Sequence, residues 1–321
     1  MTEKNINRRK ALQFIGVAAA GTALARKVDG QPIKTPSPAG LKFTYCLNMS
    51  TIRGQNLGFM KELKTAAAAG FRSVEIWMDS MQQYLQSGGS IKEVKILLND
   101  LGLKVEDCIS FNKWVVDDPG IRQQGIENMK REMDILAQIG CKRIAATGMG
   151  TTDNDVPGLD VIASRYGTIL DIGGSFGVVP QIEMWGFQKN MHDVAEVLYI
   201  AMKSRRPSAR ILLDVFHLYR GNTSLETLSL MDPNAVEMFH MNDYPPGFPY
   251  QTIIDADRIY PGDGIAPIKQ TLSILLKNRK TPLVLSTELF NKAYYQQDAL
   301  TVAQTSLAKM KTITAALQGA L

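Results

Sequence analysis

Cysteine is scarce in this 321-residue sequence, and its spacing excludes two classes of protein. The three cysteines, Cys46, Cys108 and Cys141, are odd in number and far apart, with no C-x-x-C pair. A zinc knuckle and a disulfide-stapled scaffold both need paired cysteines, so neither fits. All three lie in or beside apolar, strand-like runs, and we expect them to be buried.

A basic excess is also missing once the N-terminus is set aside. Residues 1–25 hold four of the 36 Lys and Arg and one of the 31 Asp and Glu, which leaves 32 basic and 30 acidic residues. A net charge of +2 with no basic stripe gives no reason to expect a nucleic-acid partner.

The first 25 residues differ from the rest of the chain. A basic stretch at 7–10 (Asn-Arg-Arg-Lys) precedes an Ala- and Gly-rich apolar run that ends in Ala-Leu-Ala at 23–25. This pattern is typical of a secretory signal of the twin-arginine type, and the run is too short for a stable membrane anchor. We predict a signal peptide at 1–25, a linker at 26–40 and export to the periplasm. A cytoplasmic location follows if the leader is not functional.

After the linker, short β-rich runs alternate with amphipathic helical stretches. Expected strands are 43–47, 73–77, 104–110, 143–147, 178–183, 210–214, 236–241 and 283–287. Expected helices are 57–69, 91–101, 121–139, 159–176, 191–204, 225–231, 265–276 and 299–317. Eight such units predict one α/β domain over residues 41–321, a (β/α)₈ TIM barrel. The alternative, an open doubly wound sheet, would need a Gly-rich turn after the first strand, which residues 46–50 (Cys-Leu-Asn-Met-Ser) do not provide.

Each strand in the second half ends on a side chain that can bind a metal. These residues are Glu183, Asp214, His240 and Glu288, and the active site of a TIM barrel lies at the C-terminal strand ends. Three carboxylates and one imidazole suit a divalent ion, and a cation removes the cost of burying the carboxylates together. We predict one bound ion, with Mn²⁺ favoured and Mg²⁺, Co²⁺ or Zn²⁺ as alternatives.

The segments around these residues resemble the motifs of the xylose isomerase-like TIM-barrel superfamily, the sugar phosphate isomerase/epimerase group. They are 181–183 (QIE), 213–217 (LDVFH), 239–243 (FHMND), 257–264 (DRIYPGDG) and 286–288 (STE). The resemblance runs from about residue 41 to the C-terminus and implies the same four metal ligands. It also implies that His217 and Arg258 contact the substrate.

The resemblance implies a sugar isomerase or epimerase. Glu183 and Glu288 would act as an acid/base pair that removes and returns a proton beside a carbonyl, through a metal-stabilised enediolate. From their positions beyond strand ends, Trp185 is expected to stack on the sugar and Arg220 to reach it, with Trp77 and Trp114 as weaker candidates. The expected partner is a small carbohydrate, and whether the chain forms a homo-oligomer stays open.

Three comparisons with the superfamily's pattern narrow the predicted substrate, metal content and function. Lys189 stands where the epimerase pattern has an acidic residue, which argues against a free ketohexose bound in that family's manner. A second metal, on Asp243, Asp255, Asp257 or Asp263 in the loop after the seventh strand, is less favoured. The superfamily's three-zinc apurinic endonucleases need histidines at the ends of the second and third strands, and the three histidines here lie elsewhere.

Two other functions stay open. The same chemistry could expel a leaving group, which would make the protein a lyase or glycoside-cleaving enzyme on a substrate such as a 3-keto-glycoside. A sugar-binding barrel without catalysis is the third reading, and the complete set of four ligands argues against it.

Overall fold

The computed structural model describes residues 42–151 and 156–318. The predicted signal peptide and linker lie outside these ranges and remain predictions. Among the described residues, no helix is both long enough and apolar enough to span a membrane.

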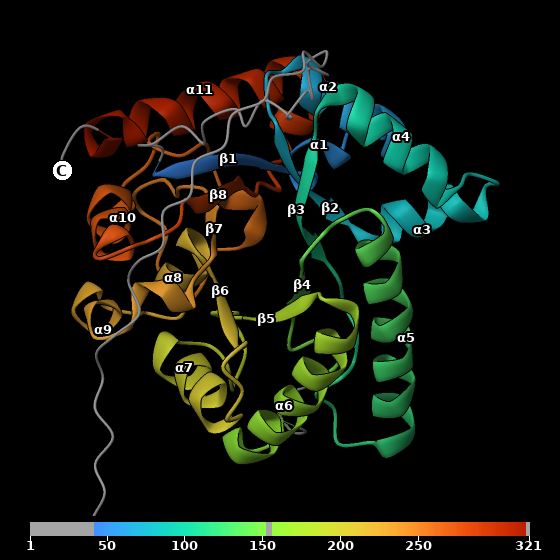
Figure 1. The fold of residues 1–321 in the computed structure, drawn as a ribbon. Coiled ribbons are helices and arrows are strands. Elements are labelled where there is room, and N and C mark those ends of the chain that lie inside the picture. The colour runs from blue at the N-terminus through green and yellow to red at the C-terminus, as the bar shows by residue number, and fades with distance from the viewer. Residues whose placement is uncertain (1–41, 152–155, 319–321) are drawn as a thin grey trace, which may run out of the picture. The chain divides into compact units, whose positions relative to one another are not determined.

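Eight parallel strands form the centre of the molecule, in the order β3-β2-β1-β8-β7-β6-β5-β4 (Figure 1). All eight expected strands are present, with ends that differ by at most two residues. Their bounds are β1 Phe43–Asn48, β2 Ser73–Trp77, β3 Lys104–Ile109, β4 Arg143–Ala146, β5 Val179–Glu183, β6 Arg210–Asp214, β7 Met238–Met241 and β8 Leu283–Thr287. The predicted TIM barrel is therefore confirmed.

The barrel is nearly closed, and side chains bridge its seam. In the described ranges β3 and β4 form the two ends of the hydrogen-bonded sheet. Arg143 on β4 donates from Nη1 to the main-chain oxygen of Glu106 on β3 at 3.1 Å and to its Oε2 at 3.2 Å. The hydroxyl of Thr147 reaches the carbonyl of Ser110 at 3.4 Å. These bonds hold the seam together without a regular ladder.

Helices surround the strands (Figure 1). The expected helices appear as α2 Phe59–Ala68, α4 Ile91–Leu101, α5 Pro119–Gln138, α6 Leu159–Phe176, α7 Val194–Lys203, α9 Leu225–Ser229, α10 Ile268–Leu276 and α11 Ala299–Gln318. Three helices were not expected, α1 Ser50–Arg53, α3 Met78–Gln86 and α8 Val215–Arg220. There are also short 3₁₀ turns, η1 Pro233–Ala235, η2 Asp255–Asp257 and η3 Tyr294–Gln296.

The unexpected helices start at or close to strand ends, with no loop between strand and helix to mark a boundary. Trp77 ends β2 and is also the N-cap of α3, while Asp214 ends β6 and caps α8 by accepting the N–H of His217 at 2.9 Å. The three cysteines are fully buried in the core, as expected. The strand-to-helix joints face the C-terminal end of the barrel, where they place polar side chains around a common space.

Candidate metal and active site

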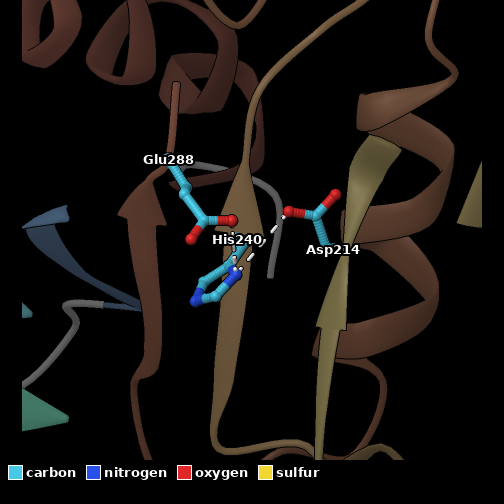
Figure 2. Close-up of side chains that lie close together, drawn as sticks. All are labelled: Asp214, His240 and Glu288. Atoms are coloured by element: carbon cyan, nitrogen blue, oxygen red, sulfur yellow. Dashed lines mark ion pairs between the residues drawn. The ribbon is translucent and has the colours of Figure 1, made fainter. Parts of the chain in front are cut away.

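Asp214, His240 and Glu288 converge at the C-terminal ends of β6, β7 and β8 (Figure 2). Asp214 pairs with His240 in the sheet register, and His240 pairs with Ser286, two residues before Glu288. Neighbouring parallel strands thus bring the three side chains to one level. One ligand atom from each lies within 4.8 Å of the others, and all three residues are buried. The arrangement can hold a metal ion.

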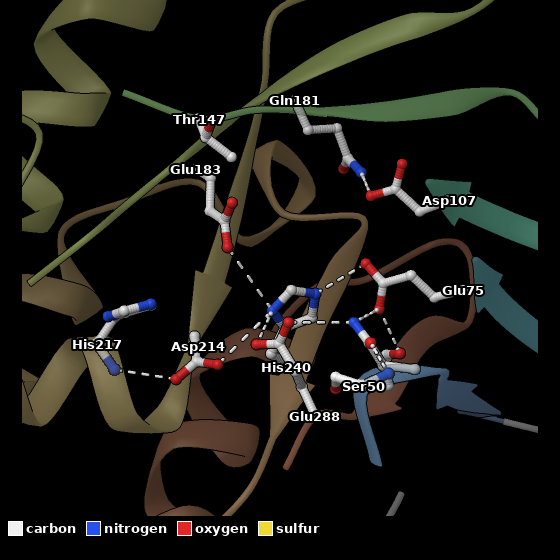
Figure 3. Close-up of polar contacts among 12 residues, drawn as sticks. Ser50, Glu75, Asp107, Thr147, Gln181, Glu183, Asp214, His217, His240 and Glu288 are labelled. Carbon is white, nitrogen blue, oxygen red and sulfur yellow. Dashed lines mark hydrogen bonds and ion pairs between the residues drawn. The ribbon is translucent and has the colours of Figure 1, made fainter. Parts of the chain in front are cut away.

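The imidazole of His240 is oriented for metal binding. Its Nε2 lies 2.9 Å from Glu75 Oε1, whereas its buried Nδ1 has no hydrogen-bond partner among the described residues. Nδ1 faces Glu288 Oε2 at 3.1 Å, Asp214 Oδ2 at 3.6 Å and Glu183 Oε1 at 3.9 Å (Figure 3). A buried ring nitrogen that faces three carboxylates without a well-formed hydrogen bond fits a cation. The other ring nitrogen is held by a carboxylate, as in many histidine–metal sites.

Glu183 borders this cluster and is not one of its closest members. Its Oε1 points towards His240 Nδ1, but the group whose ligand atoms all lie within 4.8 Å comprises Asp214, His240 and Glu288. Burial raises the pKa of Glu183 well above its usual range; His240 opposes this shift and Glu288 adds to it. Glu183 therefore lies at the edge of the cluster, with its Oε1 3.9 Å from His240 Nδ1.

Neighbouring charges shift the pKa values of Asp214 and His240 in opposite directions. Burial alone would raise the pKa of Asp214, but Arg258, helped by the two histidines, lowers it well below its usual range. Burial likewise would lower the pKa of His240, yet Glu288 and Glu75 raise it well above normal. A metal ion at Nδ1 would therefore have to displace a proton, so its binding should weaken as the pH falls.

Arg258, which follows η2, reaches into the cluster from the loop between β7 and α10. Its Nη1 donates to Asp214 Oδ2 at 2.8 Å and to Glu288 Oε2 at 2.9 Å. Its Nη2 donates to Asp255 at 2.6 Å and lies 3.3 Å from His217 Nε2. Burial lowers the pKa of His217 to about 4, so its imidazole is neutral at pH 7. Both residues that the family resemblance assigned to the substrate thus lie beside the cluster.

A pocket of about 180 Å³ opens above the cluster, and aromatic rings form much of its wall. Adjacent ring centroids are 5.3 Å apart for Trp77 and Phe111, 6.2 Å for Phe111 and Trp185, and 5.3 Å for Trp185 and Phe187. The other lining residues are Ile109, Glu183, His217, Asp255, Arg258, Glu288 and Phe290. Flat apolar walls with a few polar groups at the bottom suit a sugar ring or another small molecule with an apolar face.

Several expectations about single side chains can be compared with this pocket. Trp185 and Trp77 line it, and their stacking on a sugar stays a prediction. Trp114 was a weaker candidate and does not, because it is fully buried and its Nε1 donates to the carbonyl of Thr147 at 2.8 Å. Arg220 is not among the lining residues either, so its substrate contact stays a prediction.

Sequence reasoning did not predict that Phe111, Phe187 and Phe290 line the pocket. It also did not predict that Asn48 and Glu75 contact the cluster. The one available signal was Glu75, a charged residue in the middle of the apolar strand Ser73–Trp77. A charge in such a run needs a partner when it is buried. The phenylalanines gave no comparable signal, because an aromatic residue after a strand is more often part of the core.

The acidic residues considered as ligands of a second metal form hydrogen bonds and ion pairs with other groups. Asp243 accepts hydrogen bonds from three backbone N–H groups of residues 262–266, at 2.9 to 3.0 Å. Asp255 pairs with Arg258, Asp257 accepts a backbone N–H, and Asp263 pairs with a lysine. In the part of the chain that the structure describes, these side chains form no second group with metal-ligand spacing.

Comparisons with known proteins agree with this fold. An inosose isomerase of Bacillus licheniformis is 27% identical over 270 residues, which cover 81% of this chain and 94% of that protein. A solved structure described as IOLI protein with a binding zinc atom superimposes with a TM-score of 0.78 at 21% identity, over 85% of this chain and 98% of the other. A D-psicose 3-epimerase structure gives a TM-score of 0.67 at 15% identity, over 84% and 99%. The family model for the xylose isomerase-like TIM barrel matches residues 63–313, and the chain belongs to that family.

Proposed function

We propose that this protein is a divalent-metal-dependent isomerase or epimerase of a keto-sugar. The observation that carries the proposal is the convergence of Asp214, His240 and Glu288, with the buried Nδ1 of His240 facing the two carboxylates. Relatives named as inosose isomerases support the reaction class. Mn²⁺ is the proposed ion, and metal analysis of purified protein tests that choice against Zn²⁺, Mg²⁺ and Co²⁺.

Asp214, His240 and Glu288 hold the ion in this proposal, with Glu183 as the fourth ligand. The bound ion supplies a Lewis acid that polarises the substrate carbonyl. Glu183 extends from β5 and Glu288 follows β8, so they approach the space above the cluster from different strands. One carboxylate takes the proton from the carbon beside the carbonyl, and the other returns a proton to complete the isomerisation.

Arg258 and the aromatic wall prepare the substrate for that step. The guanidinium keeps Glu288 oriented through Nη1 and stands beside the neutral His217. Charge that develops on the substrate oxygen near this group would be stabilised without rearrangement. Trp185 and Phe111 exclude water from one side of the pocket and offer flat faces for the sugar.

Solvent-deuterium exchange at the carbon beside the carbonyl tests the proposal. Wild-type protein with Mn²⁺ should incorporate deuterium into at least one of an inosose, D-fructose and a 3-keto-glucoside. Glu288→Gln should lower that rate by about 10²-fold or more, because it removes both a proton carrier and a ligand. Glu132→Gln is the matched control, since Glu132 is a buried carboxylate that lies outside the pocket lining.

Two results would contradict the proposal. One is unchanged exchange in Glu288→Gln, and the other is no exchange by the wild type on any substrate with any of the four ions. Release of a leaving group in place of a reprotonated sugar would assign the protein to the lyase alternative. Export of the chain by residues 1–25 is proposed separately, and cell fractionation tests it.

A further inference from the structure

Behind the cluster, on the Nε2 side of the His240 ring, Glu75 lies fully buried on β2 and has three partners (Figure 3). Its Oε1 lies 2.9 Å from His240 Nε2. Its Oε2 accepts from Asn48 Nδ2 at 2.8 Å and from Ser286 Oγ at 2.6 Å. A carboxylate is expensive to bury, and here its hydrogen bonds connect side chains of β1, β7 and β8.

Asn48 extends this network to a second member of the cluster. Its amide nitrogen also donates to Glu288 Oε1 at 3.2 Å. Its Oδ1 accepts from Trp77 Nε1 at 2.8 Å and from the N–H of Ser50 at 2.9 Å, which fixes the orientation of the amide. Asn48 can therefore turn only its N–H groups towards Glu75 and Glu288.

We infer that Glu75 is a positioning residue that fixes the ring orientation of His240 and, through Asn48, one oxygen of Glu288. Because a carboxylate only accepts, it requires a proton on His240 Nε2 and leaves the Nδ1 lone pair for the ion. The inference rests on the proposed metal site and does not depend on which sugar is the substrate.

The variant Glu75→Gln tests this hydrogen-bond polarity with little change in volume. If the new amide turns its oxygen to His240, its N–H₂ group meets the N–H₂ group of Asn48, and two donors face each other. If it turns its N–H₂ group to His240, Nε2 must accept and the ring proton moves to Nδ1. Either arrangement disturbs one ligand, so Mn²⁺ affinity should fall about 10- to 100-fold.

The double variant Glu75→Gln with Asn48→Asp reverses the polarity of the pair. The amide oxygen introduced at position 75 can then accept from His240, while the amide N–H₂ group donates to the new carboxylate at position 48. That carboxylate still accepts from Trp77 and Ser50. The tautomer of His240 with its proton on Nε2 returns, but the new carboxylate oxygen faces Glu288 Oε1, to which Asn48 Nδ2 donates at 3.2 Å in the wild type. We therefore expect the double variant to regain the wild-type tautomer of His240 rather than the wild-type Mn²⁺ affinity.

Calorimetric titration of the metal-free proteins with Mn²⁺ measures these affinities. Nitrogen-15 spectra of the zinc-loaded proteins report the tautomer directly, and the chain has three histidines to resolve. In wild-type protein His240 should carry its proton on Nε2. Glu132→Gln is again the control, because Glu132 is buried and accepts from Ser110, Asn112 and Gln82, and it should bind Mn²⁺ like the wild type.

Wild-type affinity in Glu75→Gln, or a wild-type His240 that carries its proton on Nδ1, would overturn the inference. A double variant whose His240 carries its proton on Nδ1 would overturn it as well. If Glu75→Gln does not fold, the wild-type nitrogen-15 spectrum still decides. Normal Mn²⁺ binding without deuterium exchange on any substrate would count against the proposed function and leave this inference standing.

Discussion

The buried guanidinium of Arg258 lies between Asp214 and Glu288, two of the three residues that converge on the proposed ion. It offsets their charges, and three carboxylates raise its own pKa despite burial. The same side chain packs over the ring of Phe216, with its Cζ 4.4 Å from the ring centroid. Arg258 therefore contributes to the stability of the metal-free protein as well as to the site.

Removing this charge should make folding depend on the metal. In metal-free protein, Arg258→Met should lower the free energy of unfolding by about 3–5 kcal/mol, because buried carboxylates lose their counter-ion. Saturating Mn²⁺ should recover more stability in this variant than in the wild type. Thermal unfolding with and without Mn²⁺ measures both effects, and Arg258→Lys, which keeps the charge, is the comparison. Equal stabilisation of all three proteins by the ion would disprove this reading of Arg258.

At the scale of one element, α2 has a buried acid in its first turn. Glu62 is 4% exposed, and its Oε2 has no hydrogen-bond partner among the described residues. Burial raises the pKa of Glu62 to about 7, with Arg53 opposing the shift and Asp79 adding to it. The folded protein therefore holds this proton more tightly than the unfolded chain, whose carboxyl has an ordinary pKa.

The sign of the resulting pH dependence follows from linkage. The stabilising effect of the proton is complete below the unfolded pKa and is lost as the pH rises through about 7. Glu62→Gln should be neutral in its effect near pH 4 and stabilising by on the order of 2 kcal/mol near pH 8. Chemical denaturation of both proteins across this range measures the difference. A stabilisation that is the same at both pH values would show that ionisation of Glu62 is not the cause.

The whole molecule depends on how the barrel closes between β3 and β4. Arg143 bridges this seam to Glu106 and also donates to Glu237 at 2.9 Å, while its side chain is 17% exposed. Every other pair of neighbouring strands in the described sheet has a parallel ladder. The seam is thus the place where the barrel should open first.

Arg143→Met should destabilise the protein by about 2 kcal/mol, because it leaves Glu106 and Glu237 with fewer donors. Amide hydrogen exchange should increase first in β3 and β4, before the strands inside the sheet. The control is Arg206→Met, which breaks an exposed pair with Asp171 and should change stability by less than about 1 kcal/mol. Uniform exchange across all eight strands would contradict this account of closure.

The sequence alone determined the barrel and the level at which its polar side chains lie. Alternation of apolar strands with amphipathic helices leaves few architectures, and parallel strands bring their C-terminal ends to one side. Glu183, Asp214, His240 and Glu288 could therefore be grouped without coordinates. The short helices α1, α3 and α8 were not predicted, because strand residues such as Trp77 and Asp214 also serve as helix N-caps.

Only the tertiary structure decided how closely the four residues approach and what surrounds them. It brings three of them within ligand distance, with Glu183 beside them, and it places Glu75 and Asn48 behind the cluster. Strand order determines which residues share a level, but side-chain packing across the barrel determines which atoms meet. Contacts such as Glu75 with His240, 165 residues apart, leave no local pattern in the chain.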